Sequence, residues 1–291
     1  MFCGRLRGTL SWFRLLSLSL LLSLLVLLCS PVQARSLRKA TQLWEQATVH
    51  QAALAYISLG TLNDMVRGRR LSRAKAQGHL RMLIAQLDRE LRALKTLKVY
   101  GSGKAKAFVR HLRVVFDFLL QAARAFDAYL RSPSQATMRA FLTLRNAAAR
   151  DVGKTFRHPG RKRVRSYRGG WRVARFQLSN SVAREVALGY LTIGLLGDAY
   201  FKRLLSQSQL LGFLNTALQS LSESSRLSAR VTRQHRGKDR RILFRLFKAR
   251  AELVQQGASL KAFVTSRKRS YLRKYSLHRR RAWAYLAFLG R

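Results

Sequence analysis

The sequence contains an internal repeat in which the second copy lies 134 residues after the first. Residues 53–66 read ALAYISLGTLNDMV and residues 187–200 read ALGYLTIGLLGDAY, with six of fourteen positions identical. The same offset continues without a gap to the Gly-Lys pairs at 103–104 and 237–238. Leucine pairs match by chance in leucine-rich helices, but the tyrosine, glycine and aspartate pairs share one register. We interpret the repeat as a tandem duplication, so the fold must accommodate one unit twice.

The hydrophobic periodicity predicts helices throughout both units. Apolar residues recur at steps of three and four, as in the stripe from Phe108 through Leu112 and Phe116, which is the spacing of an amphipathic helix. No Asn-Gly or Asp-Gly turn lies between alternating apolar runs, so β-hairpins are not predicted. The fold class is therefore all-α, a tandem duplication of a roughly four-helix unit. Two helical bundles and one continuous helical array both satisfy this pattern.

Turn and capping signals give approximate helix boundaries. Ser132 before Pro133 is a typical helix start, and Ser206 with Gln209 has the form of a capping box. The expected helices are 41–66, 71–98, 104–131 and 133–150 in the first unit, and 180–204, 206–230, 238–266 and 268–289 in the second. The expected domains are a signal peptide at 1–34, a first helical unit at 35–150, a basic linker at 151–180 and a second helical unit at 181–291.

The N-terminal segment has the features of a secretory signal peptide. Three arginines without an acid precede an apolar run from Leu15 to Leu28, and Val32 and Ala34 form a cleavage signal before Arg35. An uncleaved membrane anchor is the alternative, because the apolar run approaches the length of a transmembrane helix. Either interpretation predicts an exported protein, whether periplasmic, secreted or membrane-anchored.

Cleavage would also remove both cysteines. Cys3 and Cys29 lie within the segment, so the mature chain would have no disulfide, no thiolate nucleophile and no cysteine-based metal site.

The net charge limits the partners that the protein can have. The chain carries 57 Lys and Arg against 12 Asp and Glu, a formal charge of +45, and loss of the three arginines before Ala34 would leave +42. A small domain usually carries a charge of about 2 to 8 in magnitude. Hydrophobic residues make up 48% of the chain, which excludes disorder by composition. We therefore expect a folded protein with an anionic partner.

Arginine clusters are the candidate binding residues for that partner. Guanidinium groups bind phosphate and carboxylate bidentately, and the clusters concentrate in the linker and the second unit. The expected partner is an anionic polymer or surface: envelope polysaccharide, lipopolysaccharide, anionic lipid or nucleic acid. The candidates are Arg161, Lys162, Arg163, Arg165, Arg233, Arg236, Lys238, Arg240, Arg241, Arg267, Lys268, Arg269, Arg279, Arg280 and Arg281.

A Tyr–Gly–Asp pattern occurs in both units with a spacing of four residues, which places its members on one helix face. We interpret it as a packing seam, where glycine allows close helix approach and the aspartate needs a cation from a neighbouring helix. The alternative is a cryptic carboxylate site in a helical enzyme. The residues are Tyr56, Gly60 and Asp64 in the first unit, and Tyr190, Gly194 and Asp198 in the second.

We find no complete catalytic or cofactor-binding motif in the sequence. Gly153-Lys154-Thr155 resembles the end of a phosphate-binding loop, but Ala148 stands where its first glycine is required. The six histidines have no metal-ligand spacing. We expect a non-catalytic protein without cofactor or metal. A third interpretation is an organellar or intracellular nucleic-acid-binding protein whose N-terminus is an import signal.

Overall fold

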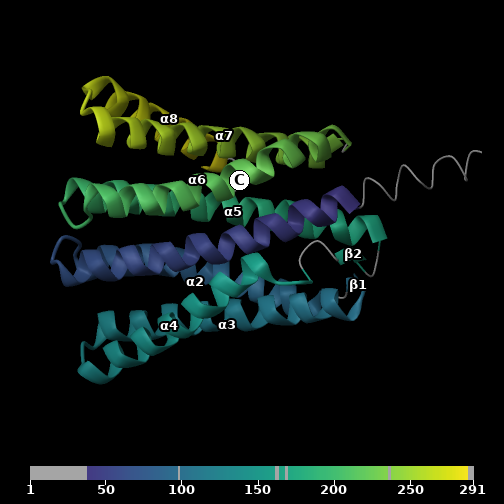
Figure 1. The fold of residues 1–291 in the computed structure, drawn as a ribbon, viewed down its shortest axis with the longest axis horizontal. Helices are drawn as coiled ribbons and strands as arrows, with labels where there is room; N and C mark the ends of the chain where they lie inside the picture. Colours follow the sequence, from purple (N-terminus) through teal and green to yellow (C-terminus); the bar gives the residue numbers. More distant parts are fainter. Residues whose placement is uncertain (1–37, 98, 161–163, 168–169, 235–236, 288–291) are drawn as a thin grey trace, which may run out of the picture.

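A computed structural model of the chain describes residues 38–97, 99–160, 164–167, 170–234 and 237–287. These residues form eight helices and one pair of short strands, so the all-α class is confirmed (Figure 1). The predicted signal peptide lies outside the described residues. The helices are a first helix at residues 38–67, then α2 (Arg73–Thr96), α3 (Gly103–Arg131), α4 (Gln135–Arg157), α5 (Gly170–Phe201), α6 (Gln207–Gln234), α7 (Gly237–Ser266) and α8 (Arg269–Ala287).

The first helix and α5 run side by side through the middle of the molecule. Hydrogen bonds join them at His50 to Glu185 and again, two turns further along both helices, at Ser58 to Thr192. In Figure 1 the α3–α4 hairpin lies along one edge and the α7–α8 hairpin along the opposite edge. Helix α5 packs directly on both α6 and α7, and α2 packs on α3 and α5. The result is one continuous array of helices.

The two central helices are enclosed on nearly every side. Within the first helix only Arg38, Asp64 and Arg67 are exposed, and none of residues 178–200 in α5 is exposed. A helix that lies between neighbours on all sides is not restricted to a single apolar stripe. The largest fully buried side chain of the described residues, Trp44, is on the first helix.

The boundaries of the helices repeat with the offset seen in the sequence. Helices α6, α7 and α8 begin 134 residues after α2, α3 and α4 respectively. The turns before α2 and α6 also correspond, because Arg69 and Arg203 both have a positive φ, of 53° and 60°. In each turn the residue before that arginine donates its backbone N–H to an aspartate carbonyl, at 2.9 Å in the first and 3.1 Å in the second.

The connection between the halves differs from the predicted linker at 151–180. Helix α4 continues to Arg157 and α5 already begins at Gly170, so the described non-helical residues are confined to the interval between them. Packing explains the extension of α4, because Val152 and Thr155 are buried despite the basic composition of the segment. Within the connection, β2 (Val164–Tyr167) pairs antiparallel with β1 (Val99–Gly101).

Two predicted helix starts have different outcomes. Helix α4 starts at Gln135 rather than Pro133, because the side chain of Ser134 forms a capping box with Thr137. The predicted capping box of α6 is confirmed: Ser206 Oγ accepts from the Gln209 backbone N–H at 3.2 Å, and Gln209 Oε1 accepts from the Ser206 N–H at 2.9 Å.

Candidate anion-binding site

Several of the few acidic side chains lie in the interior of the fold. Among the described side chains four carboxylates are buried, and only two arginines, Arg184 and Arg250, and no lysine are buried with them. Burial removes these carboxylates from the surface, where they would offset exposed lysines and arginines. The surface is therefore more basic than the composition indicates. The buried carboxylates belong to Glu45, Glu90, Asp127 and Glu185.

Glu185 of α5 forms the centre of a buried ion network. Its carboxylate accepts a hydrogen bond from Arg250 of α7, and His50 Nδ1 lies 2.9 Å from its other oxygen, with all three side chains fully buried. Burial raises the pKa of Glu185, but Arg250 and His50 more than offset this effect and the pKa is lowered overall. The network consequently holds a carboxylate anion inside the array.

Glu90 of α2 is the second buried anion. Arg184 Nε donates to its carboxylate at 2.5 Å, and the hydroxyl groups of Thr48 and Ser181 donate at 3.2 and 3.3 Å. These contacts connect the first helix, α2 and α5 across the middle of the protein. Because every one of these polar groups is satisfied internally, we assign this network to the stability of the fold.

The candidate binding site is an open cleft of about 770 Å³ between α7 and α8. Arg241 and Arg245 are four residues apart on α7, so they share one face of that helix, with Phe244 beside them. Arg281 and Tyr285 have the same spacing on α8 and line the opposite wall. The antiparallel pairing of α7 and α8 thus brings together three guanidinium groups and two aromatic rings.

The surroundings of the cleft favour an anion. The side chain of Phe244 is 49% exposed, and Lys248 Nζ lies 5.4 Å from its ring centroid, which extends the basic stripe of α7 by one turn. Glu252 is the only carboxylate among the described residues that line the cleft. It lies 2.7 Å from His278 Nδ1, so it is already hydrogen-bonded to a side chain of α8.

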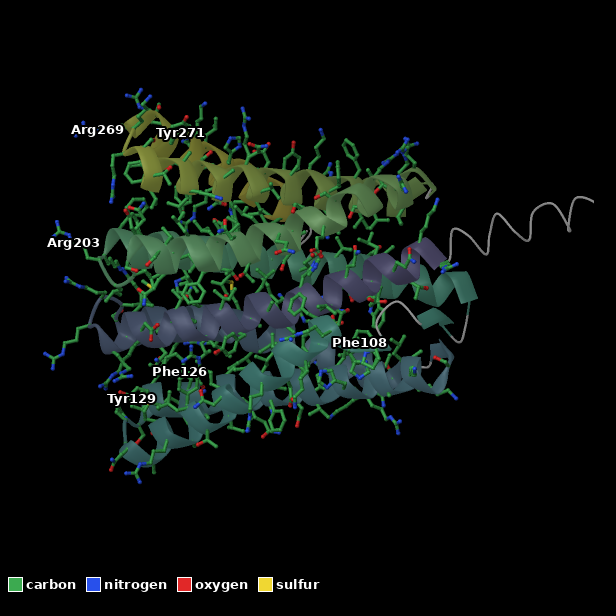
Figure 2. The ribbon with its side chains drawn as sticks, in the orientation of Figure 1. Phe108, Phe126, Tyr129, Arg203, Arg269 and Tyr271 are labelled. Atoms are coloured by element: carbon green, nitrogen blue, oxygen red, sulfur yellow. The ribbon has the colours of Figure 1, made fainter. Side chains whose placement is uncertain are left out.

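The predicted anion-binding residues lie in several places. Arg241 and Arg281 line the cleft, whereas Arg233, Arg240 and Arg280 are exposed on the helices that form it or lead to it. Arg267, Lys268 and Arg269 are exposed at the turn between α7 and α8, and Figure 2 shows Arg269 at the same end of the array as Arg203. Outside the described residues, or without a described side chain, are Arg161, Lys162, Arg163, Arg165, Arg236 and Lys238.

Unlike the exposed arginines, Arg279 is partly buried and packs against α5. Its guanidinium lies over the Tyr190 ring at 5.8 Å and 3.7 Å from Asp198. A Cβ built on Gly194 would be 3.0 Å from its Nη2 atom, so the glycine makes room for the arginine. The second Tyr–Gly–Asp pattern is thus covered by an arginine of α8.

The first Tyr–Gly–Asp pattern has a similar arrangement with Arg145 of α4, which lies 134 residues before Arg279. Arg145 lies over the Tyr56 ring at 5.3 Å, and a Cβ on Gly60 would be 2.6 Å from its Nη2 atom. Asp64 differs, since it is exposed and accepts a hydrogen bond from Asn63 at 3.1 Å.

Sequence reasoning did not identify Phe244 and Arg245, which line the cleft, or the neighbouring Lys248 as binding residues. Their spacing relative to Arg241 was a usable signal, because three- and four-residue steps place them on the same helix face. The pairing of that face with α8 depends on tertiary packing.

Comparison with known proteins gives no relative. No family model matches the sequence, and no match is found among curated proteins or solved structures. Within the described part of the chain, no helix has the length and apolar character needed to cross a membrane. The same residues contain no group of three or more His, Cys, Asp or Glu side chains placed to hold a metal ion.

Proposed function

We propose that this protein is an exported, non-catalytic helical protein that binds an anionic polymer at the cleft between α7 and α8. The observation that carries the proposal is the convergence of Arg241, Arg245 and Arg281 in that cleft. The guanidinium groups of Arg241 and Arg281 provide bidentate donors for sulfate, phosphate or carboxylate groups, and the alkyl stems and neighbouring rings give the site an apolar floor.

The two halves of the chain have different residues at the positions that form this cleft. This difference supports a binding role that belongs to the second half alone. We propose that the halves arose by tandem duplication, as the shared helix starts and the paired arginines Arg145 and Arg279 support. At the offset of 134, alanines at 107 and 147 correspond to Arg241 and Arg281. The second unit therefore carries guanidinium groups at positions where the first has only methyl groups.

A polymer fits the distribution of charge better than a small anion does. Exposed arginines continue from the cleft to the α7–α8 turn, where Arg267, Lys268 and Arg269 lie together. An extended polyanion can contact many such side chains and release one counterion for nearly every contact. Binding should then weaken steeply with increasing salt.

Export remains part of the proposal because of the N-terminal sequence. We propose that residues 1–34 direct export and are removed before Arg35, which would place a protein of charge +42 where envelope or extracellular polyanions occur. N-terminal sequencing of the native protein tests this step: a first residue of Arg35 supports export, and cleavage at a different position supports import into an organelle.

The binding proposal is tested with the chain from Arg35 onward and three probes: heparin, polyphosphate and single-stranded DNA. We expect binding at low salt, with a logarithmic salt slope that the variant Arg241→Gln/Arg281→Gln reduces by about 1.5 to 2. The matched control is Arg81→Gln/Arg139→Gln, which removes two exposed charges from α2 and α4. An equal reduction of the salt slope in both variants would assign binding to the overall charge of the protein and contradict binding at the cleft.

Nucleic acid is a second candidate partner because of the aromatic side chains in the cleft. The exposed ring of Phe244 and the neighbouring Tyr285 can stack on unpaired bases, which a polysaccharide lacks. Phe244→Leu separates the two partners: it should weaken binding of single-stranded DNA by about fivefold and leave heparin binding unchanged.

A further inference from the structure

A second cavity, of about 390 Å³, lies between α2, α5 and α8. Met82, Gln86 and Arg89 line it from one face of α2, and Trp283 and Leu286 line it from α8. The volume falls within the range of small-molecule sites, which begins at about 300 Å³. It is formed by helices of both halves and shares no lining residue with the cleft between α7 and α8.

One end of this cavity is apolar and the other is polar. Glu90 of α2 pairs with Arg184 of α5, and the earlier residue His79 of α2 lies close enough to the later residue Asp198 of α5 for its charge to affect the histidine pKa. These two points of contact show that the helices run antiparallel here. Met82 therefore lies toward Leu191, whereas Arg89 lies toward Asn180. A ligand that fills the cavity would have an apolar body with a polar group at one end.

Large apolar side chains flank the cavity and remain partly exposed. Met82 is 49% exposed and Trp283 is 53% exposed, although both could be covered by a bound apolar group. The indole of Trp283 lies 5.5 Å from the Tyr190 ring, so one wall is aromatic. A flexible thioether opposite an aromatic wall can adapt to an alkyl chain.

The charge at the polar end is positive. Arg184 is already compensated by Glu90, to which its Nε donates at 2.5 Å. Arg89 is exposed, and no carboxylate of the described residues lies within ion-pair distance of its guanidinium. One cation of the cavity wall therefore stays available for an anionic headgroup.

We propose that this cavity binds a small single-chain anionic amphiphile, such as a medium-chain carboxylate. The alkyl chain would lie among Met82, Leu188, Leu191 and Trp283, and the headgroup would accept hydrogen bonds from Arg89. This site does not depend on the proposed polyanion site, because the lining residues of the two are different.

The test follows Trp283 fluorescence while decanoate is added below its micellar concentration, with Trp283→Phe as the blank. We expect a saturable blue shift with one decanoate per chain, and binding about tenfold tighter than that of the uncharged analogue decanol. Arg89→Gln should weaken decanoate binding by about tenfold and leave decanol binding unchanged. Arg81→Gln, an exposed arginine of α2 outside the cavity, is the matched control and should change affinity by less than about twofold.

A second variant tests the apolar part of the cavity. Ala187→Phe places a ring within the space and should abolish binding of both ligands, with folding checked by circular dichroism. Equal losses in Arg89→Gln and Arg81→Gln would show general attraction to a basic surface and overturn the proposal. Wild-type affinity in a folded Ala187→Phe protein would also overturn it, because the ligand would then lie elsewhere.

Discussion

The hydroxyl oxygens of Ser58 and Thr192 lie 2.9 Å apart in a buried hydrogen bond, and the two residues occupy equivalent positions of the repeat. Residues separated by the repeat offset of 134 can contact each other only near an axis that relates the two halves of the chain. That axis would run along the first helix and α5, the two central helices. The interface between the halves is therefore the core of the protein.

The first prediction concerns the independence of the halves. Residues 38–157 alone would expose the face of the first helix that packs on α5, and would lose the buried pair of Glu90 with Arg184. We expect this fragment to have little cooperative thermal unfolding by circular dichroism. Mixing it with residues 158–291 should restore a cooperative transition, and a fragment that melts cooperatively alone would contradict a shared core.

The second prediction compares two glycines. A Cβ on Gly160 would lie 1.9 Å from the carbonyl oxygen of Lys104, a backbone atom that cannot easily move, so Gly160→Ala should lower the free energy of unfolding by about 2 to 4 kcal/mol. Gly78 has open space around it inside α2, and Gly78→Ala should raise that free energy by about 0.5 to 1 kcal/mol. Urea denaturation measures both, and similar effects at the two sites would contradict the packing of Gly160.

The third prediction concerns the buried ion network. Glu185→Gln would leave the buried guanidinium of Arg250 without its carboxylate and should cost about 3 to 5 kcal/mol of unfolding free energy. Asp88→Asn is the control, because its partner Arg92 is 71% exposed and the pair should contribute less than about 1 kcal/mol. Chemical denaturation measures the unfolding free energy of both variants. An equal decrease in the two would contradict a larger contribution of the buried network to stability.

The fourth prediction concerns the dependence of stability on pH. Burial lowers the pKa of His79 and His158 from the ordinary value of 6.5, and the neighbouring His111 contributes at His158. The unfolded chain therefore takes up protons at a higher pH than the folded protein does. The contribution of these two histidines to the free energy of unfolding should be fully present above about pH 6.5. It should be lost progressively as the pH drops below that value.

A matched variant tests the histidine origin of this loss. His158 Nδ1 accepts a hydrogen bond from the Gly160 N–H at 3.0 Å, which protonation would abolish. His158→Asn supplies an amide oxygen acceptor that does not titrate, so the melting temperature should fall less between pH 7.5 and 5.5 than in the wild type. The lowered pKa of Glu185 gives a separate loss only below its ordinary value of 4.5. An unchanged pH profile in His158→Asn would assign the loss to other groups.

Local signals in the sequence predicted most helices, whereas the candidate site depended on long-range packing. Ser206 and Gln209 are three residues apart, so their capping box could be predicted directly. The cleft needs Arg241 and Arg281, forty residues apart, to face each other across two helices. No local pattern specifies that contact, nor the partnership of His50 with Glu185 between the two central helices.

The position of the acidic residues limits how basic this protein can become. Loss of a surface carboxylate such as Asp88 would raise the net charge at little cost in stability. Loss of Glu90 or Glu185 would leave a buried arginine without its counter-charge, and the fold would no longer tolerate that arginine. The interior, rather than the surface, thus sets the upper limit of positive charge that this architecture can carry.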